Sequence, residues 1–323
     1  MVKRSCCLMK VLALMAIPAP IKDQIAALPN VQIEGPDYLA QHGLTDITAI
    51  FGWQSRLNDL IKENSTVRFV QSFSAGVDYF PLATFQEKNI VMANTSGIHA
   101  RPIAESVLAY VLAFARGIAD SAHRTPENFW DRDASRGDVF TLPGKTALIY
   151  GTGHIGRAIA DILTQQGMTV TGISHHGEAV APFTAVGTDQ DSAAFAKAAD
   201  VIINIMPLTP ETHHFFNAAF FNALTKKPLF INVGRGPSVD TGALVAALQT
   251  NQLSGAALDV FEQEPLPATS PLWQAPHLLM TPHVSGAFAE IYTAAATILY
   301  HNLAQFIRDG SLAENQVDLS QGY

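Results

Sequence analysis

Short apolar segments alternate with segments of helical periodicity along the first hundred residues of the chain. The apolar segments have the length of buried strands, which we predict at residues 11–15, 31–34, 47–51, 68–71 and 90–92. Between them the spacing of apolar residues predicts helices at residues 21–28, 37–42 and 57–63, and Pro20 stands where a proline favours the start of the first helix. Strands that alternate with helices indicate a parallel, doubly wound sheet of the α/β class.

The next segment is apolar on nearly all of its faces over residues 103–115, and we predict one long helix from about Arg101 to His123. A helix without a polar face must be buried on most sides. Burial between two subunits predicts a homodimer built partly on this 101–123 helix. Burial between two domains of the same chain is the alternative.

A second alternation of strands and helices begins after residues 131–144, a stretch rich in charge and glycine. We predict strands at residues 145–150, 168–173, 201–205, 228–233, 255–258 and 278–281. Helices fit residues 154–166, 216–224 and 241–249, and Gly167 stands where helices often end. A last helix, at about residues 287–308, can cross back to the first series. The pattern therefore predicts two doubly wound parallel-sheet domains.

Composition narrows the class of protein. The chain has 323 residues, 48% of them hydrophobic and 15% charged, so it can bury the core of two globular domains. Its net charge of −8 disfavours a nucleic-acid partner. The only cysteines, Cys6 and Cys7, are adjacent and rarely bridge in such a position, which fits a reducing, cytoplasmic location.

The N-terminal residues need a separate interpretation. Lys3 and Arg4 precede an apolar stretch that loosely imitates a signal peptide, but Lys10 interrupts it. A translation start at Met9 would leave residues 1–8 as a dispensable tail. No apolar run reaches the ~18 residues that a membrane span needs without a charge or a proline. We therefore expect neither export nor a membrane partner.

A glycine-rich turn is the first candidate for chemistry. Gly151, Gly153 and Gly156 have the Gly-x-Gly-x-x-Gly spacing, with His154 and Ile155 between them. A predicted strand enters the turn and a predicted helix leaves it, which is the setting in which backbone N–H groups bind a dinucleotide pyrophosphate. A purely structural glycine turn is the alternative.

The end of the following strand bears on the choice of cofactor. An acidic residue there would hydrogen-bond the ribose of NAD and repel a 2′-phosphate, but the sequence reads Ser174, His175 and His176. A hydroxyl and two imidazoles favour NADP(H) over NAD(H). The alternative is that the two histidines belong to a solvated loop.

Three residues near the C-terminus carry complementary chemistry, and each follows a predicted strand. Arg235 can bind a carboxylate with two parallel hydrogen bonds. His283 can protonate a ketone oxygen as a hydride arrives. Glu264 is the expected carboxylate partner that orients His283, and Glu262 is its competitor. Because ligands bind at the carboxyl ends of parallel strands, the trio predicts a 2-oxo acid dehydrogenase.

These segments resemble the D-isomer-specific 2-hydroxyacid dehydrogenases over nearly the whole chain. The matching motifs are the glycine turn and residues 200–212, 232–237, 257–265 and 282–286. The resemblance implies a discontinuous, flavodoxin-like substrate domain at residues 1–99 and 290–323, and a Rossmann NAD(P)-binding domain at residues 100–289. It implies that Arg235 binds substrate and that His283 and Glu264 act as the acid/base pair. It implies further cofactor contacts at Met206, Pro207, Thr212, Val233, Asp259 and Gly286.

The resemblance also suggests substrate contacts in the first domain. The N–H groups of Ala75 and Gly76 would bind the substrate carboxylate, although this loop could equally be a plain turn with Asp78 capping a helix. Trp53 is similar to the pocket aromatic of glyoxylate/hydroxypyruvate reductases, or is a packed core residue. We therefore expect a small 2-oxo acid such as hydroxypyruvate or glyoxylate. The runner-up is 3-phosphoglycerate, for which Arg56 is an offset phosphate ligand.

Two other functions compete with this one. A nucleotide-sensing binding protein without turnover would use the same fold, but it has less need of an acid/base pair. His213 and His214 suggest a metal at first sight. Adjacent histidines on one strand would point to opposite faces, and no cysteine or carboxylate cluster joins them, so we expect no metal.

Overall fold

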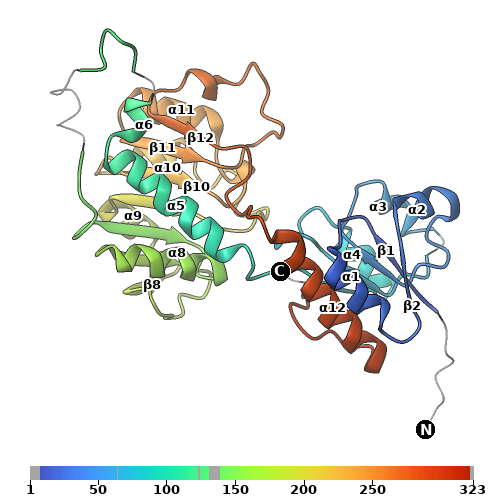
Figure 1. Ribbon diagram of the computed structural model, residues 1–323. Coiled ribbons are helices and arrows are strands. Elements are labelled where there is room, and N and C mark those ends of the chain that lie inside the picture. The colour runs from blue at the N-terminus through green and yellow to red at the C-terminus, as the bar shows by residue number, and fades with distance from the viewer. Residues whose placement is uncertain (1–7, 64, 123, 131–138, 321–323) are drawn as a thin grey trace. The chain divides into compact units, whose positions relative to one another are not determined.

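The computed structural model describes residues 8–63, 65–122, 124–130 and 139–320 (Figure 1). The chain divides into two compact units, one of Met1–His99 with Phe288–Tyr323 and one of Ala100–Ala287. Cys6, Cys7, Lys3, Arg4 and most of the charged stretch after residue 130 lie outside the described residues, so the expectations about them stay predictions.

The first unit is built on a five-stranded parallel sheet of order β2-β1-β3-β4-β5. This order is the flavodoxin-like form of the doubly wound fold, as expected. The strands are β1 (Met9–Ala13), β2 (Val31–Glu34), β3 (Ala49–Phe51), β4 (Phe69–Gln71) and β5 (Val91–Ala93). β3 is buried on both faces, which explains its unbroken apolar sequence, and β4 is equally buried although it ends in the polar Gln71.

Helices cover both faces of this sheet. One face packs against α1 (Ala19–Ala26) and the returning helix α12 (Ile291–Asp309), so the predicted crossing of the last helix is confirmed. The other face carries α2 (Pro36–His42), α3 (Leu57–Leu60) and α4 (Leu82–Glu87). α3 is shorter than expected, and α4 was not predicted from the sequence.

The second unit contains a seven-stranded parallel sheet of order β12-β11-β10-β9-β6-β7-β8. The strands are β6 (Thr146–Tyr150), β7 (Thr169–Ile173), β8 (Ala185–Gly187), β9 (Val201–Asn204), β10 (Leu229–Asn232), β11 (Gly255–Leu258) and β12 (Leu278–Met280). The chain order reverses between β6 and β9. Such a reversal point is where open α/β sheets bind ligands, beyond the carboxyl ends of the strands. β8 was not predicted, because it is only three residues long and lies at the sheet edge.

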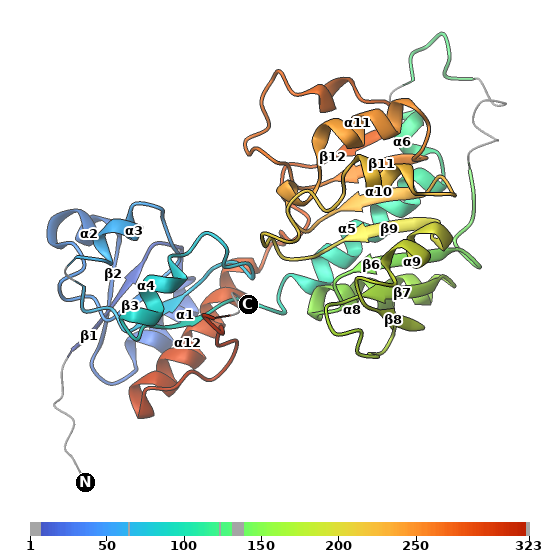
Figure 2. The same cartoon turned by 180° about the vertical axis from the view of Figure 1, so that it is seen from behind.

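Helices also cover both faces of the second sheet. α5 (Ala100–Ala115), α6 (Ile118–Ser121) and α8 (His154–Gln165) lie on the face seen in Figure 1. Figure 2 shows α9 (Ser192–Ala198), α10 (Ala218–Asn222) and α11 (Thr241–Gln249) on the other face. Among the described residues no helix combines the length and the apolar character that a membrane crossing requires.

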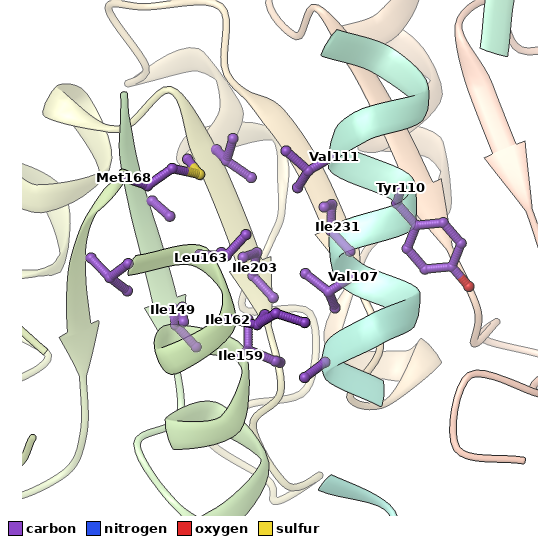
Figure 3. Packing of buried hydrophobic residues seen from close by; sticks show 14 of the residues in the cluster. Val107, Tyr110, Val111, Ile149, Ile159, Ile162, Leu163, Met168, Ile203 and Ile231 are labelled. Carbon is purple, nitrogen blue, oxygen red and sulfur yellow. The ribbon is translucent and has the colours of Figure 1, made fainter. Parts of the chain in front are cut away.

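The prediction of one helix from Arg101 to His123 was wrong. α5 ends at Ala115, and Gly117 takes a left-handed conformation with φ 64° before α6 begins. Val107 and Val111 on α5 pack with Ile159 and Leu163 on α8 over the sheet (Figure 3). Much of the apolar surface of α5 is therefore buried inside its own unit, without a second subunit.

Candidate active site

The glycine turn joins β6 to α8 and has the geometry of a phosphate cradle. Gly151 has φ +107°, and a methyl group placed on Gly156 would lie 2.0 Å from the carbonyl oxygen of Gly151. Only glycine therefore lets the helix approach the strand so closely. Gly153, in contrast, has nothing within 4 Å of its missing side chain, which leaves open space in front of the turn.

The start of α8 completes this cradle. Gly153 is the N-cap, and no described side chain caps the helix, so the N–H groups of His154, Ile155 and Gly156 are available to a ligand. The positive end of the helix dipole points the same way. These residues fit the pyrophosphate of a dinucleotide cofactor.

The loop after β7 carries Ser174, His175 and His176, and both imidazoles are exposed. The Ser174 hydroxyl accepts a hydrogen bond from the N–H of Gly177 at 3.2 Å, so its own proton remains available. His175 Nδ1 lies 3.9 Å from a carboxylate oxygen of Asp189, an acid that follows β8. Asp189 was not predicted as a site residue, because the three-residue strand β8 before it leaves no periodic pattern in the sequence. The negative charge of Asp189 disfavours binding of the 2′-phosphate of NADP at this loop, whereas His175 and His176 favour it.

The segment after β9 closes on itself through hydroxyl groups. The Thr212 hydroxyl donates to the carbonyl of Pro207 at 2.8 Å and accepts from the N–H of Thr209 at 2.7 Å. Asn204 at the end of β9 accepts from the N–H of Met206 at 3.0 Å. Met206, Pro207 and Thr212 thus belong to one ordered turn at the reversal point of the sheet.

His213 and His214 lie in a turn and not on a strand, so the prediction that they point to opposite faces of a strand was wrong. Their rings lie 4.2 Å apart at 31°, and His214 Nε2 pairs with Glu262 Oε1 at 2.6 Å. The described residues contain no group of three or more histidine, cysteine, aspartate or glutamate side chains that could hold a metal ion.

Arg235 follows β10 in a turn that is held by buried polar side chains. Its carbonyl accepts from Asn232 Nδ2 at 3.1 Å and from the Ser238 hydroxyl at 2.6 Å. Asn204 donates to both Asn232 and Ser238. Because all three polar residues are almost fully buried, the backbone that carries Arg235 has little freedom. Val233, which was expected to touch the cofactor, is buried in this turn.

Gly236 brings the Arg235 turn against the segment that carries Glu264. A methyl group on Gly236 would lie 1.8 Å from the carbonyl oxygen of Phe261. The register places Asn232 beside Leu258 and Leu258 beside Met280. Arg235, Glu264 and His283 therefore follow the carboxyl ends of three neighbouring strands.

His283 and Glu264 form the contact that the sequence analysis expected. His283 Nδ1 lies 2.7 Å from Glu264 Oε2, and the other oxygen of Glu264 accepts the N–H of Phe261 at 2.9 Å. A carboxylate can only accept, so Nδ1 donates and Nε2 is the ring nitrogen left for a ligand. The imidazole is well exposed, with 56% of its side-chain surface accessible.

Glu262, the competitor, is occupied elsewhere. Its two oxygens accept from His214 Nε2 at 2.6 Å and from the N–H of Thr241 at 2.9 Å. Burial alone would raise the pKa of Glu262, but the hydrogen bonds from Thr241 and His214 outweigh burial and hold that pKa below its ordinary value. Glu262 therefore fastens the start of α11, and Glu264 is the carboxylate that meets His283.

Asp259 anchors the loop that carries His283. Its side chain is buried and accepts hydrogen bonds from the Thr281 hydroxyl at 2.6 Å and from the N–H groups of Val284 and Ser285 at 2.9 Å. Its carbonyl accepts the N–H of His283, whose φ is +54°. The carboxylate thus holds the His283 loop, which ends at the half-buried Gly286. Its predicted contact with the nicotinamide stays untested.

In the first unit, the loop after β4 is fastened through its carbonyl groups. Asn94 donates to the carbonyl of Ala75 at 2.9 Å, and the Ser74 hydroxyl donates to that of Gly76 at 2.8 Å. The N–H groups of Ala75 and Gly76 donate to no acceptor among the described residues. They are therefore available to an anion. The helix that follows is capped by Pro81 and not by Asp78.

Trp53 is anchored at both ends of its side chain. Its Nε1 donates to Asn58 Oδ1 at 3.0 Å, and its ring packs on Phe80 and Phe85 with centroids 5.3 Å away. These contacts make it part of the first unit's core, although the residue is only half-buried. Arg56, the offset phosphate ligand of the runner-up substrate, is exposed at the start of α3.

Comparison with known proteins gives a consistent result. Residues 108–285 match the family described as D-isomer specific 2-hydroxyacid dehydrogenase, NAD binding domain. The glyoxylate/hydroxypyruvate reductase B of Citrobacter koseri is 33% identical over 301 residues, which is 91% of each chain.

Two solved structures extend the similarity to nearly the whole chain. An NADPH-dependent glyoxylate/hydroxypyruvate reductase from Sinorhizobium meliloti, in complex with NADP and sulfate, is 27% identical with a TM-score of 0.81 and covers 98% of this chain and 100% of that one. The phosphoglycerate dehydrogenase of Lactobacillus plantarum is 38% identical with a TM-score of 0.58 and covers 96% of this chain and 100% of that one.

Proposed function

Because the chain belongs to the D-isomer specific 2-hydroxyacid dehydrogenase family, we propose that it reduces a small 2-oxo acid of the glyoxylate or hydroxypyruvate type to the D-2-hydroxy acid. The observation that carries this proposal is the 2.7 Å contact between His283 and Glu264, beside the turn that holds Arg235. An exposed imidazole whose Nδ1 proton is held by a carboxylate can give or take a second proton at Nε2, which is the action of a general acid or base.

Each residue then has one task. Arg235 binds the substrate carboxylate and orients the carbonyl group. His283 donates the proton on Nε2 to the carbonyl oxygen, and Glu264 holds the ring through Nδ1 during the transfer. In the first unit, the available N–H groups of Ala75 and Gly76 are the proposed donors to a substrate carboxylate. The cofactor supplies the hydride when it is bound to the glycine turn.

The substrate type is supported by the relatives whose names include glyoxylate/hydroxypyruvate reductase. The similarity to a phosphoglycerate dehydrogenase keeps 3-phosphoglycerate as the runner-up. A phosphate would need a fixed cation in the first unit, and Arg56 there is an exposed side chain at a helix start. The sensor without turnover is less well supported, because a pure binding protein gains nothing from the His283–Glu264 contact.

We propose NADPH as the preferred hydride donor. The support is the Ser174, His175 and His176 sequence and the NADPH dependence of the Sinorhizobium meliloti relative. Asp189 is the residue that limits this preference. Replacing it with asparagine should raise the ratio of kcat/KM for NADPH over NADH. A wild-type enzyme that prefers NADH would contradict the proposal.

We also propose a homodimer through the second unit. Ile118, Phe129 and Trp130 expose 59%, 54% and 75% of their surface shortly after α5. Apolar surface of this kind is typical of contacts with another chain. Light scattering on the purified protein should give the mass of a dimer, and W130E should give a monomer.

One assay panel tests the proposed reaction. Purified protein is supplied with NADPH or NADH and with glyoxylate, hydroxypyruvate, pyruvate or longer 2-oxo acids, and with 3-phosphoglycerate in the oxidative direction. We expect the highest kcat/KM for glyoxylate or hydroxypyruvate. Turnover of 3-phosphoglycerate alone would show that it is the substrate in place of a small 2-oxo acid. If the protein turned over none of these acids, the proposed reaction would be rejected.

A further inference from the structure

We infer that Tyr110 on α5 is a positioning residue for the proton transfer, because it fixes the loop that carries His283. This inference rests on the proposed function for its kinetic consequence. Its structural part, the restraint of the loop, stands on contacts within the second unit.

Tyr110 reaches the loop through a chain of hydroxyl groups. Its hydroxyl lies 2.6 Å from the Thr281 hydroxyl, which donates to Asp259 Oδ1 at 2.6 Å. A threonine hydroxyl has a single proton, so Thr281 must accept the proton of Tyr110 while it donates to Asp259. Tyr110 and Asp259 are 6% and 1% exposed, so water does not compete well for these bonds.

A second contact from α5 reaches the other end of the same loop. The Ser106 hydroxyl donates to the carbonyl of Ser285 at 3.1 Å. Ser106 and Tyr110 are four residues apart, so they lie on one face of the helix. Figure 3 shows the Tyr110 ring on the side of α5 away from Val107 and Val111. One face of α5 therefore packs on α8, and another holds the His283 loop at Thr281 and Ser285.

The loop needs this restraint because its backbone is unusual. His283 has φ +54°, a conformation that residues other than glycine adopt at a cost of about 1 kcal/mol or more. It persists because Asp259 binds Val284 and Ser285 on one side and Thr281 on the other. Tyr110 orients the hydroxyl that completes this set.

The imidazole must also meet a partner that is fixed separately. Glu264 is held by the N–H of Phe261, which does not belong to the His283 loop. A small shift of the loop therefore changes the distance from His283 to Glu264 directly. Burial raises the pKa of Tyr110, against the effect of its hydrogen bond with Thr281, so the phenol keeps its proton and remains a donor at assay pH.

The test compares two tyrosines of the same unit. Y110F removes one hydroxyl and keeps the ring. Y150F is the matched control, because the buried Tyr150 also pairs its hydroxyl with a single hydroxyl, that of Ser192 at 2.8 Å. We expect Y110F to lower kcat roughly 3- to 30-fold, less than the ~10²-fold loss that a 1 Å misplacement can cause. KM for NADPH should be unchanged, and Y150F should keep the wild-type kcat.

Hydrogen exchange supplies a readout that does not depend on turnover. Y110F should accelerate exchange of the Val284 and Ser285 amides several-fold, and Y150F should not. T281V should reproduce the effect and T281S should restore it. Equal kcat and equal exchange in Y110F and wild type, or equal losses in Y110F and Y150F, would overturn the inference. Faster loop exchange in a protein that reduces no 2-oxo acid would instead reject the proposed function and keep the restraint.

Discussion

Two loops, one in each unit, are fastened to the ends of parallel strands by opposite means. The loop at Ala75 and Gly76 is held through its carbonyl groups by neutral side chains, so its N–H groups stay available to an anion. The loop at His283 is held through its N–H groups by the carboxylate of Asp259, so it offers a side chain instead. An anchor that accepts consumes backbone donors, whereas an anchor that donates leaves them for a ligand.

The neutral anchor of the Ala75 loop, the side chain of Asn94, belongs to a larger buried network of hydrogen bonds. Gln71 Nε2 donates to the carbonyl of Asn94 at 3.0 Å, and its side-chain oxygen accepts from Asn302 Nδ2 at 2.9 Å. Asn302 Oδ1 accepts the N–H groups of Ala313 and Glu314. The returning helix α12 is thereby connected to the Ala75 loop by amides alone. These groups do not titrate, so this loop should keep its shape across a wide pH range.

Replacing Asp259, the charged anchor of the His283 loop, should have the largest effect on stability and on kcat. D259N replaces an acceptor of three hydrogen bonds with a group that presents N–H to one of the donors. We expect a loss of about 2–4 kcal/mol in the free energy of unfolding and a fall in kcat of more than ~10²-fold. Denaturant unfolding and steady-state kinetics measure these two quantities. D240N is the control, because asparagine caps α11 as well as aspartate does. A wild-type kcat in D259N would show that the carboxylate does not set the loop.

Separating the Arg235 turn from the Glu264 segment should come next. G236A places a methyl group 1.8 Å from the Phe261 carbonyl oxygen, so the two segments must move apart. We expect kcat/KM for the 2-oxo acid to fall by roughly 10²-fold. G35A is the control, since a methyl group there meets nothing within 4 Å. Equal kinetics in G236A and G35A would contradict the close packing of the two turns.

Breaking the neutral anchor should affect binding more than chemistry. N302L removes the partner of Gln71 and of two backbone N–H groups, at a cost of about 2–3 kcal/mol in stability. We expect KM for the 2-oxo acid to rise several-fold while kcat changes less. Q305L on the same helix is the control. An unchanged KM in N302L would show that the buried amide network does not set the conformation of the Ala75 loop.

The smallest effect is expected at Glu262 and depends on pH. Its pKa is lower in the folded than in the unfolded chain, so its stabilisation is complete above the unfolded pKa of ~4.3 and is lost as pH falls through the folded pKa. E262Q should therefore cost about 1 kcal/mol at pH 7 and less near pH 3. Denaturant unfolding at both pH values, with E178Q at an exposed position as the control, measures this difference. A cost independent of pH would show that the charge is not involved.

The two loops also differ in how far the sequence predicts them. Arg235, Glu264 and His283 could be found because each follows an apolar strand and carries a distinctive side chain. Glu264 was preferred over Glu262 from the sequence, but the physical reason needed the structure, because His214 and Thr241 bind the competitor. Asp259 as the anchor of the loop needed the pairing of β11 with β12, which no local pattern encodes.

Other misses have similar causes. Asp189 follows a three-residue edge strand that is too short to leave a periodic signal. The break after α5 depends on one glycine, Gly117, whose left-handed conformation is decided by the packing around it. The glycine turn was predicted well because its spacing is itself a steric requirement, as Gly156 shows.

The central claim is that His283 and Glu264 act as one unit in proton transfer. A double-mutant cycle with H283A, E264Q and the combined variant tests it most directly, with kcat for 2-oxo acid reduction as the measurement. We predict that H283A lowers kcat by ~10²–10⁴-fold and that E264Q costs nothing further once His283 is absent. Losses that multiply in the double variant, or turnover that survives H283A, would contradict the account.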